Sequence, residues 1–115
     1  MSATHPLRGS IFETMVVSEL VKSRLHRGER PNLFFWRDSN GNEVDVVVEQ
    51  GNSLIPVEIK SGKTVTGEAF ASLEKWRGLA RKACRKPTLI HGGGDRYQRS
   101  GVSVVGWRES AGILS

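Results

Sequence analysis

The chain has 115 residues, of which 37% are hydrophobic and 25% charged, a composition typical of one soluble globular domain. Seventeen Lys and Arg residues against twelve Asp and Glu residues give a net charge of +5, which favours anionic partners. The single cysteine, Cys84, excludes an internal disulfide, and no apolar segment is long enough to span a membrane. We therefore expect a cytoplasmic protein without a membrane partner.

The first predicted element is a helix from about Ser10 to Arg27. Ser10 and Glu13 form a capping-box pattern at its start, and apolar residues repeat at helical spacing along one face. Glu19 falls in the middle of this apolar arc. We therefore expect the helix to leave the core near Glu19 and to place this carboxylate at the rim of a site.

Three strands joined by hairpin turns are predicted next, at 32–38, 43–49 and 53–60. In the second and third strands, β-branched residues alternate with polar residues, and turn residues bound both segments. The Asn-Gly pair within the turn at 39–42 is the strongest short hairpin signal. The pattern places Val44, Val46 and Val48 on one face of the second strand.

A second helix is predicted from Thr66 to about Arg85, where apolar residues again repeat at helical spacing, and Pro87 ends it. Strands at 88–91 and 102–107 follow. The element order α-β-β-β-α-β-β indicates an α/β (α+β) sandwich around one mixed sheet. We expect a single domain over 1–115 with an ordered core at about 7–107, and a tail at 109–115 that is frayed.

The residues with candidate chemistry lie on the second and third strands. Residues two apart on a strand share a face, so Glu58 and Lys60 project the same way, about 6.5–7 Å apart. Asp45 lies within the apolar run of the preceding strand. Mg²⁺ prefers oxygen ligands, and a nearby lysine can orient a water or stabilise charge on a phosphate. The pattern predicts a metal site if the strands are antiparallel neighbours, and Glu19 could add a third carboxylate. The alternative is an ordinary salt bridge on a solvated sheet face.

Val44-Asp45, a hairpin and then Glu58-Ile59-Lys60 resemble the motif of the PD-(D/E)XK, or restriction-endonuclease-like, nuclease superfamily, in the variant that lacks the proline before the aspartate. The leading helix and the element order also fit that fold. More narrowly, the segments 9–13, 18–20, 41–45 and 55–62 resemble the nuclease-like C-terminal domain, of unknown function, of a prokaryotic AAA+-type ATPase family. The resemblance covers about Leu7 to Trp107.

This resemblance implies a Mg²⁺- or Mn²⁺-dependent nuclease, a hydrolase that acts on DNA or RNA. It makes Asp45 and Glu58 metal ligands, with the backbone carbonyl of Ile59 as a candidate third ligand. Lys60 becomes the catalytic lysine, and Glu19 becomes the helix acid that supports the metal or its water. The resemblance also leaves room for a homodimer, because nucleases that cut two strands are commonly dimeric.

The ATPase portion of that family is missing from the sequence. Gly62-Lys63-Thr64 resembles the end of a P-loop, but the first glycine of that motif would fall at Val57, within a strand. We therefore do not expect the chain to hydrolyse ATP. It is either the C-terminal domain of a longer ATPase or a stand-alone relative.

Basic residues crowd the second half of the second predicted helix. They are Lys75, Arg77, Arg81, Lys82, Arg85 and Lys86. Contacts with nucleic-acid phosphates would give affinity without sequence choice, and the alternative is a solvated helix face. The segment Gly92–Gly94 is not followed by a helix pattern, so a phosphate cradle is not expected there.

Two functions of other classes stay open. The fold could be a non-catalytic regulatory module of an ATPase, which holds nucleic acid or protein without cutting. It could also be a protein–protein module with a salt-bridged sheet face. Metal binding separates the nuclease from both, and salt-dependent binding of nucleic acid separates the two modules from each other.

Overall fold

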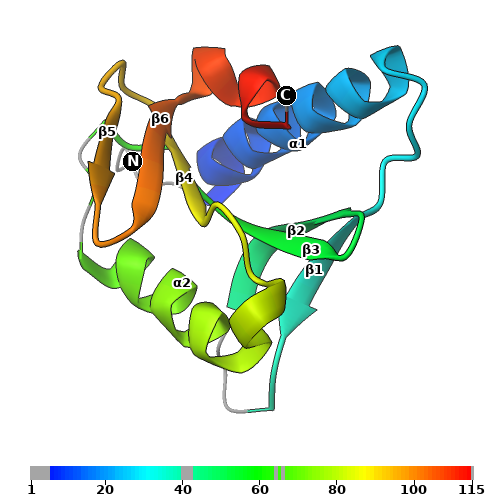
Figure 1. Ribbon diagram of the computed structural model, residues 1–115. Coiled ribbons are helices and arrows are strands. Elements are labelled where there is room, and N and C mark those ends of the chain that lie inside the picture. The colour runs from blue at the N-terminus through cyan, green and yellow to red at the C-terminus, as the bar shows by residue number, and fades with distance from the viewer. Residues whose placement is uncertain (1–5, 40–42, 64, 66, 115) are drawn as a thin grey trace.

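The computed structural model describes residues 6–39, 43–63, 65 and 67–114 (Figure 1). Two helices and six strands occur in the described residues: α1 (Pro6–His26), β1 (Leu33–Arg37), β2 (Glu43–Gln50), β3 (Ser53–Lys60), α2 (Gly67–Ala80), β4 (Thr88–His91), β5 (Tyr97–Arg99) and β6 (Val102–Gly106). Two 3₁₀ helices accompany them, η1 (Arg81–Ala83) and η2 (Trp107–Leu114). No helix in these ranges has the length and apolar character that a membrane crossing requires.

The strands form one mixed sheet in the order β1-β2-β3-β4-β6-β5. β1, β2 and β3 are antiparallel neighbours, whereas β3, β4 and β6 run parallel to one another, and β5 is an antiparallel edge strand. α1 and η2 cover one face of the sheet, and α2 covers the other (Figure 1). The predicted sandwich around one mixed sheet is therefore confirmed.

The hydrophobic core lies on both faces of the sheet. On the α1 face, Val16 and Leu20 pack against strand residues that include Ile55. On the α2 face, Leu73 packs against Leu89 and other residues of the parallel strands. The side chains of all five are buried. Burial of this apolar surface holds the central strands in place between the helices.

The order of elements differs from the predicted one in two places. Tyr97–Arg99 forms an additional strand, and because all three of its residues are exposed, it has no alternating pattern of burial. Residues 109–114 of the tail that we expected to fray belong to η2, where the buried Ser110 donates a hydrogen bond from its hydroxyl to the carbonyl of Trp107 at 2.7 Å. The predicted turn residues 40–42 and the predicted helix cap Thr66 lie outside the described residues.

Strand β2 contains a β-bulge next to Asp45. Between the pairs Phe34–Val47 and Trp36–Val44, β1 advances by two residues while β2 advances by three. An extra residue in one strand leaves it unpaired and bends the strand locally. The bulge therefore places Asp45 in a segment whose side chains do not follow regular strand geometry.

Because of the bulge, the predicted alternation of side chains in β2 is wrong. Val44 and Val47 pack with Trp76 on the α2 face, whereas Val46 and Val48 belong to the core cluster beneath α1. Strict alternation would have placed Val44, Val46 and Val48 on one face. Because of the extra residue, the side chains of Val44 and Val46 lie on opposite faces of the sheet.

Candidate metal centre

Asp45 and Glu58 lie where the ladder between β2 and β3 ends. The regular pairing of these strands stops at Val46 and Val57. Beyond that pair, the backbone N–H of Asp45 donates to Glu58 Oε1 at 3.1 Å, and the N–H of Ile59 donates to Asp45 Oδ2 at 2.8 Å. Each carboxylate thus accepts a hydrogen bond from the backbone of the opposite strand. These two bonds continue the link between the strands and orient both side chains.

Both carboxylates are withdrawn from water. Glu58 is only 4% exposed, and Asp45 is partly buried. Burial, followed by the negative charge of Asp45, raises the pKa of Glu58 to about 8. Burial also raises the pKa of Asp45. Two adjacent carboxylates in a poorly hydrated site oppose each other's ionisation, so a cation with a preference for oxygen ligands would be stabilised here.

Lys60 lies beside this pair, on the same strand as Glu58. Its Nζ is 3.9 Å from Glu58 Oε2, and its side chain is 49% exposed. The two side chains meet because residues two apart on a strand share a face. The positive charge of Lys60 lowers the pKa of both carboxyl groups, but its influence is smaller than that of burial. The structure therefore brings Asp45, Glu58 and Lys60 together.

A further acid, Glu13 on α1, faces the same site. Its pKa is raised first by partial burial and then by the negative charges of Asp45 and Glu43, and Lys60 lowers it. The charges of Asp45, Glu43 and Lys60 therefore act on Glu13 from the strands beneath α1. Glu13 also borders a hollow of about 270 Å³ together with Phe35, which is 73% exposed.

The sequence reasoning missed Glu13 because it assigned that residue to a capping box with Ser10. The helix begins at Pro6 instead, which places Glu13 about two turns inside α1. Glu13 and Glu19 both adjoin apolar positions of the same helix, so local periodicity does not separate them. The direction in which α1 crosses the sheet decides which acid reaches the strand carboxylates.

Glu19, the predicted helix acid, lies elsewhere on α1. Six residues separate it from Glu13, which corresponds to about 9 Å of rise and about 240° of rotation. Its Oε1 lies 3.6 Å from Lys22 Nζ, and the residue lines a hollow together with Trp107 and Arg108 of the C-terminal segment. The structure does not bring Glu19 to the two strand carboxylates. Glu19 therefore lies at the edge of a hollow, as expected, but η2 forms the other side of that hollow.

The candidate ligands form a pair and not a larger cluster. Within the described ranges, no group of three or more His, Cys, Asp and Glu side chains is arranged to hold a metal ion. Sites for Mg²⁺ commonly use one or two carboxylates, and water and substrate phosphate complete the shell. The two backbone hydrogen bonds use Asp45 Oδ2 and Glu58 Oε1, and of the other two oxygens Glu58 Oε2 lies 3.9 Å from Lys60 Nζ. The residues fit Mg²⁺ or Mn²⁺ in this mode, and the ligand role of the Ile59 carbonyl stays a prediction.

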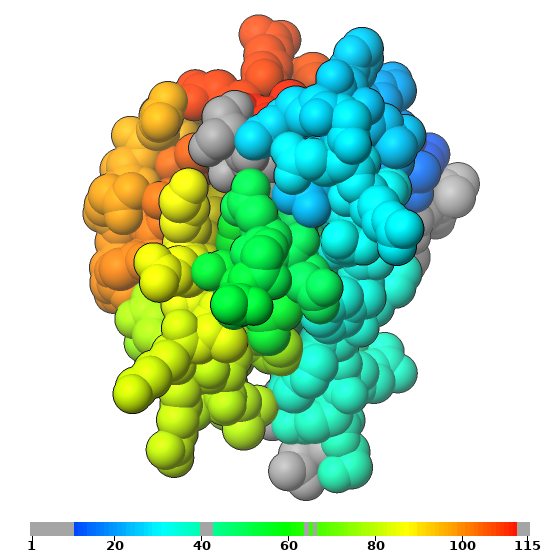
Figure 2. Space-filling model, turned by 45° about the vertical axis from the view of Figure 1, so that its right-hand side comes forward, coloured from blue at the N-terminus to red at the C-terminus, as the bar shows by residue number. Residues whose placement is uncertain are grey.

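The part of the basic run that follows α2 lies at the opposite end of β3. Cys84 forms a bridge with Leu54, and the N–H of Arg85 donates to the Leu54 carbonyl at 3.0 Å. Leu54 is six residues from Lys60 along the strand, about 20 Å away. Figure 2 shows the residues that follow α2, in yellow-green, beside the green β2–β3 turn. The structure therefore places the end of the basic run far from the candidate metal ligands.

Among these basic residues, Arg77 has an evident structural role. Its Nη1 lies 3.1 Å from Glu74 Oε1, and its Nη2 donates to the carbonyl of Ser100 at 3.2 Å. Arg77 thereby ties α2 to the turn between β5 and β6. The side chains of the other five basic residues of the run are exposed: Lys75, Arg81, Lys82, Arg85 and Lys86. Their contact with nucleic acid stays a prediction.

Comparison with known proteins identifies one family. The model of the family described as "Domain of unknown function (DUF4143)" matches residues 8–109. The matched range contains Glu13, Asp45, Glu58 and Lys60. No curated protein matches the chain.

Proposed function

We propose that this chain, which belongs to the DUF4143 family, is a metal-dependent phosphodiesterase that acts on nucleic acid. The observation that carries the proposal is the orientation of Asp45 and Glu58 by reciprocal backbone hydrogen bonds, with Lys60 Nζ 3.9 Å from Glu58. The sequence resemblance to PD-(D/E)XK nucleases, which rests on the same three residues, supports the same function.

Asp45 and Glu58 would hold Mg²⁺ or Mn²⁺, with the Ile59 carbonyl as a candidate third protein ligand. Both ions prefer oxygen ligands of this kind. The bound ion would polarise the phosphodiester and lower the pKa of a bound water. Glu58 would release the proton that its burial favours, because only the ionised carboxylate is an effective ligand.

Lys60 would act on the substrate rather than on the fold, because its side chain is 49% exposed. Its amine lies at the exposed side of the carboxylate pair, where a phosphate would approach. A fixed positive charge at that position would stabilise the negative charge that develops during attack on the phosphate. Lys60 could also orient the attacking water.

Glu13 would serve as the proton acceptor. Its pKa is raised from the ordinary value, and it interacts with both Asp45 and Lys60. A carboxylate whose pKa lies closer to the working pH is a more effective general base than an unperturbed one. In this proposal Glu13 accepts the proton of the attacking water, the role that the sequence reasoning gave in part to Glu19.

The test begins with metal binding, which requires no knowledge of the substrate. Mn²⁺ is titrated into the wild-type protein and into Asp45→Asn, and free Mn²⁺ is followed by its paramagnetic signal. We expect the wild type to bind and the variant to bind much more weakly. Glu19→Gln is the matched control, because it neutralises an acid on α1 outside the site, and it should bind like the wild type. Equal binding in wild type and Asp45→Asn would contradict the proposal.

Cleavage is then measured on labelled DNA and RNA, single-stranded and duplex. We expect metal-dependent cleavage by the wild type and its loss in Lys60→Ala, with Mn²⁺ binding retained. Cleavage that survives both Asp45→Asn and Lys60→Ala would come from another site or a contaminant, and it would count against the proposal.

A non-catalytic module is the second candidate, and one observation favours it. Each strand carboxylate already accepts a hydrogen bond from a backbone N–H, so the only role of the pair could be to link β2 and β3. In that case the wild type would bind no Mn²⁺, with or without nucleic acid. Asp45→Asn would then change stability alone. The Mn²⁺ titration therefore separates the two candidates.

A further inference from the structure

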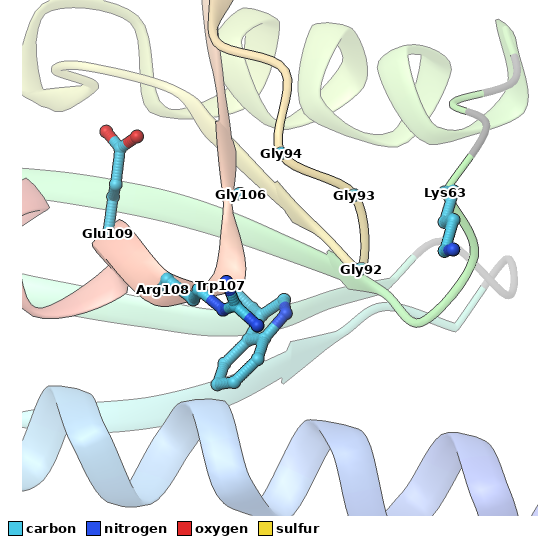
Figure 3. A pocket seen from close by; sticks show the side chains of 8 residues that line it. All are labelled: Lys63, Gly92, Gly93, Gly94, Gly106, Trp107, Arg108 and Glu109. Carbon is cyan, nitrogen blue, oxygen red and sulfur yellow. The ribbon is translucent and has the colours of Figure 1, made fainter.

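A second concave site lies at the same edge of the sheet as Lys60. A cleft of about 520 Å³ opens between the loop after β3, the Gly92–Gly94 loop and the start of η2 (Figure 3). Lys60, His91 and Gly106 lie in register across β3, β4 and β6, so the cleft is at the carboxyl ends of three parallel strands. Ligand sites of open α/β sheets are commonly found at this edge.

The floor of the cleft is backbone because the loops approach each other too closely for side chains. A Cβ at Gly92 would collide with the backbone carbonyl of Ser61, and a Cβ at Gly106 would lie 2.5 Å from the carbonyl oxygen of Gly93. The N–H groups of Gly92 and Gly93 are already engaged, with the Gly62 carbonyl at 2.9 Å and with His91 Nδ1 at 3.0 Å. The backbone of the floor therefore determines the shape of the cleft, and the side chains of the walls determine its charge.

The walls carry two cations. Lys63 lies on one side of the Gly92 loop, and Arg108 lies on the other with Trp107 (Figure 3). The guanidinium of Arg108 lies 5.2 Å from the centroid of the Trp107 ring, which limits the orientations of its planar group. The acid on the lining, Glu109, pairs with Arg96 at 2.9 Å and points away from both cations (Figure 3). The cleft therefore presents net positive charge.

We propose that this cleft binds a phosphate group of the nucleic-acid strand that is cut at the candidate metal centre, an inference that rests on the proposed function. Arg108 offers a fork of donors that matches phosphate oxygens, and Lys63 offers a point charge. Two strand spacings, about 10 Å, separate Lys60 from Gly106 in the sheet. Nearby phosphates of one strand can span that separation, so the same strand can occupy both sites.

The experiment compares two double variants that remove the same charge. Lys63→Gln/Arg108→Gln empties the cleft of cations. Lys22→Gln/Arg30→Gln is the control, because both of its side chains are exposed residues outside the cleft lining. Affinity for fluorescein-labelled single-stranded and duplex oligonucleotides is measured by anisotropy over a range of salt concentrations, with Ca²⁺ in place of Mg²⁺ to suppress cleavage. Mn²⁺ binding is measured for every variant.

We expect the cleft variant to bind the oligonucleotide about tenfold more weakly and to depend less on salt. Each lost phosphate contact should flatten the slope of log K against log[salt] by about 0.7 to 0.9. The control should keep the wild-type slope, and both variants should keep wild-type Mn²⁺ binding. Equal affinity and slope in the two double variants would overturn the cleft assignment, while intact Mn²⁺ binding and cleavage would leave the nuclease proposal standing. Absence of oligonucleotide binding by the wild type, with Mn²⁺ binding intact, would overturn the cleft assignment and the nucleic-acid substrate together.

A competition with inorganic phosphate identifies the source of the phosphate group. A strand is held at more than one phosphate, so we expect the oligonucleotide to bind at far lower concentration than inorganic phosphate does. Inorganic phosphate that displaces the oligonucleotide at a similar concentration would overturn the assignment to a strand. The cleft would then be a site for a small phosphate compound.

Discussion

The N–H of Ile59 donates to Asp45 Oδ2 at 2.8 Å, so the orientation of the Asp45 carboxylate depends on the backbone at the end of β3. The reverse bond, from the Asp45 N–H to Glu58 Oε1, makes the dependence mutual. Both bonds occupy the place where the ladder between β2 and β3 has stopped, next to the bulge in β2. The same two side chains thus link the strands and form the candidate metal site, and the predictions below separate these two roles.

Asp45→Ala should lower the free energy of unfolding in the absence of metal. The substitution leaves the Ile59 N–H without its acceptor in a partly buried position, which costs about 1–3 kcal/mol. Asp45→Asn keeps a side-chain oxygen there and should be less destabilised. The measurement is denaturant unfolding in EDTA. The control is Glu43→Ala, which breaks an exposed ion pair with Arg37 and should cost no more than about 1 kcal/mol. Equal stability of the Ala and Asn variants would contradict a structural role for this hydrogen bond.

Without metal, the free energy of unfolding should fall as pH rises from about 4.5 to about 8. The pKa of Glu58 is about 8 in the folded chain, against an ordinary value of 4.5. Between these values the folded state keeps a proton that the unfolded state has lost, so rising pH favours unfolding. The burial that raises the pKa of Asp45 acts in the same direction.

Glu58→Gln is the variant that checks this pH dependence. Its side chain cannot ionise, so the decline should be much smaller than in the wild type, and the difference between the two proteins should grow from about pH 4.5 towards pH 8. Denaturant unfolding in EDTA across this range gives the comparison. Parallel curves for the two proteins would show that Glu58 ionises normally in the fold.

Local periodicity was sufficient to predict which strand residues come together. Glu58 and Lys60 share a face because side chains of a strand alternate, and Asp45 comes close because a short hairpin joins antiparallel neighbours. The sheet and the two long helices follow from the same local patterns. The bulge next to Asp45 does not, because it depends on how β1 pairs with β2 and leaves no mark in the order of valines.

The remaining features depend on contacts between segments far apart in the sequence. The cleft brings together Lys63, Gly92 and Arg108, which follow three different strands. The sequence does not predict a phosphate site at Gly92–Gly94, because no helix pattern follows this segment. Strand β5 was missed because exposed strands show no alternation. Pattern reasoning predicts elements, and the faces of strands that are regular, but it does not predict bulges or which loops converge.

Lys60→Ala should abolish cleavage and leave the fold intact. A fixed charge that stabilises developing negative charge contributes about 10²–10³-fold to the rate. The side chain is about half exposed, so its removal should change the free energy of unfolding by less than about 1 kcal/mol. Rates on the best substrate, thermal unfolding and Mn²⁺ binding are measured together. Lys22→Ala removes another exposed lysine and should match the wild type in all three. An unchanged rate in Lys60→Ala would exclude the role proposed for this residue.

Glu13→Gln and Glu19→Gln distinguish the acid whose pKa is affected by Asp45 and Lys60 from the acid that the sequence favoured. Both substitutions neutralise a carboxylate on α1, and both keep the size of the side chain. Glu13 interacts with Asp45 and Lys60, whereas Glu19 pairs with Lys22 beside η2. Glu13→Gln should therefore slow cleavage by about 10²-fold, the lower end for loss of a general base, and should keep Mn²⁺ binding. Glu19→Gln should leave the rate unchanged.

The pH profile adds a readout that a merely structural role of Glu13 would not change. If Glu13 accepts the proton of the attacking water, the wild-type rate should rise with pH as the Glu13 carboxyl group ionises, because only the ionised form is a base. At saturating Mn²⁺, which keeps Glu58 ionised, this limb of the profile should disappear in Glu13→Gln, and it should persist in Glu19→Gln. A profile of unchanged shape in Glu13→Gln would assign the base to another group. The reverse result, in which Glu19→Gln alone is slow, would mean that α1 sits differently over the sheet when substrate is bound.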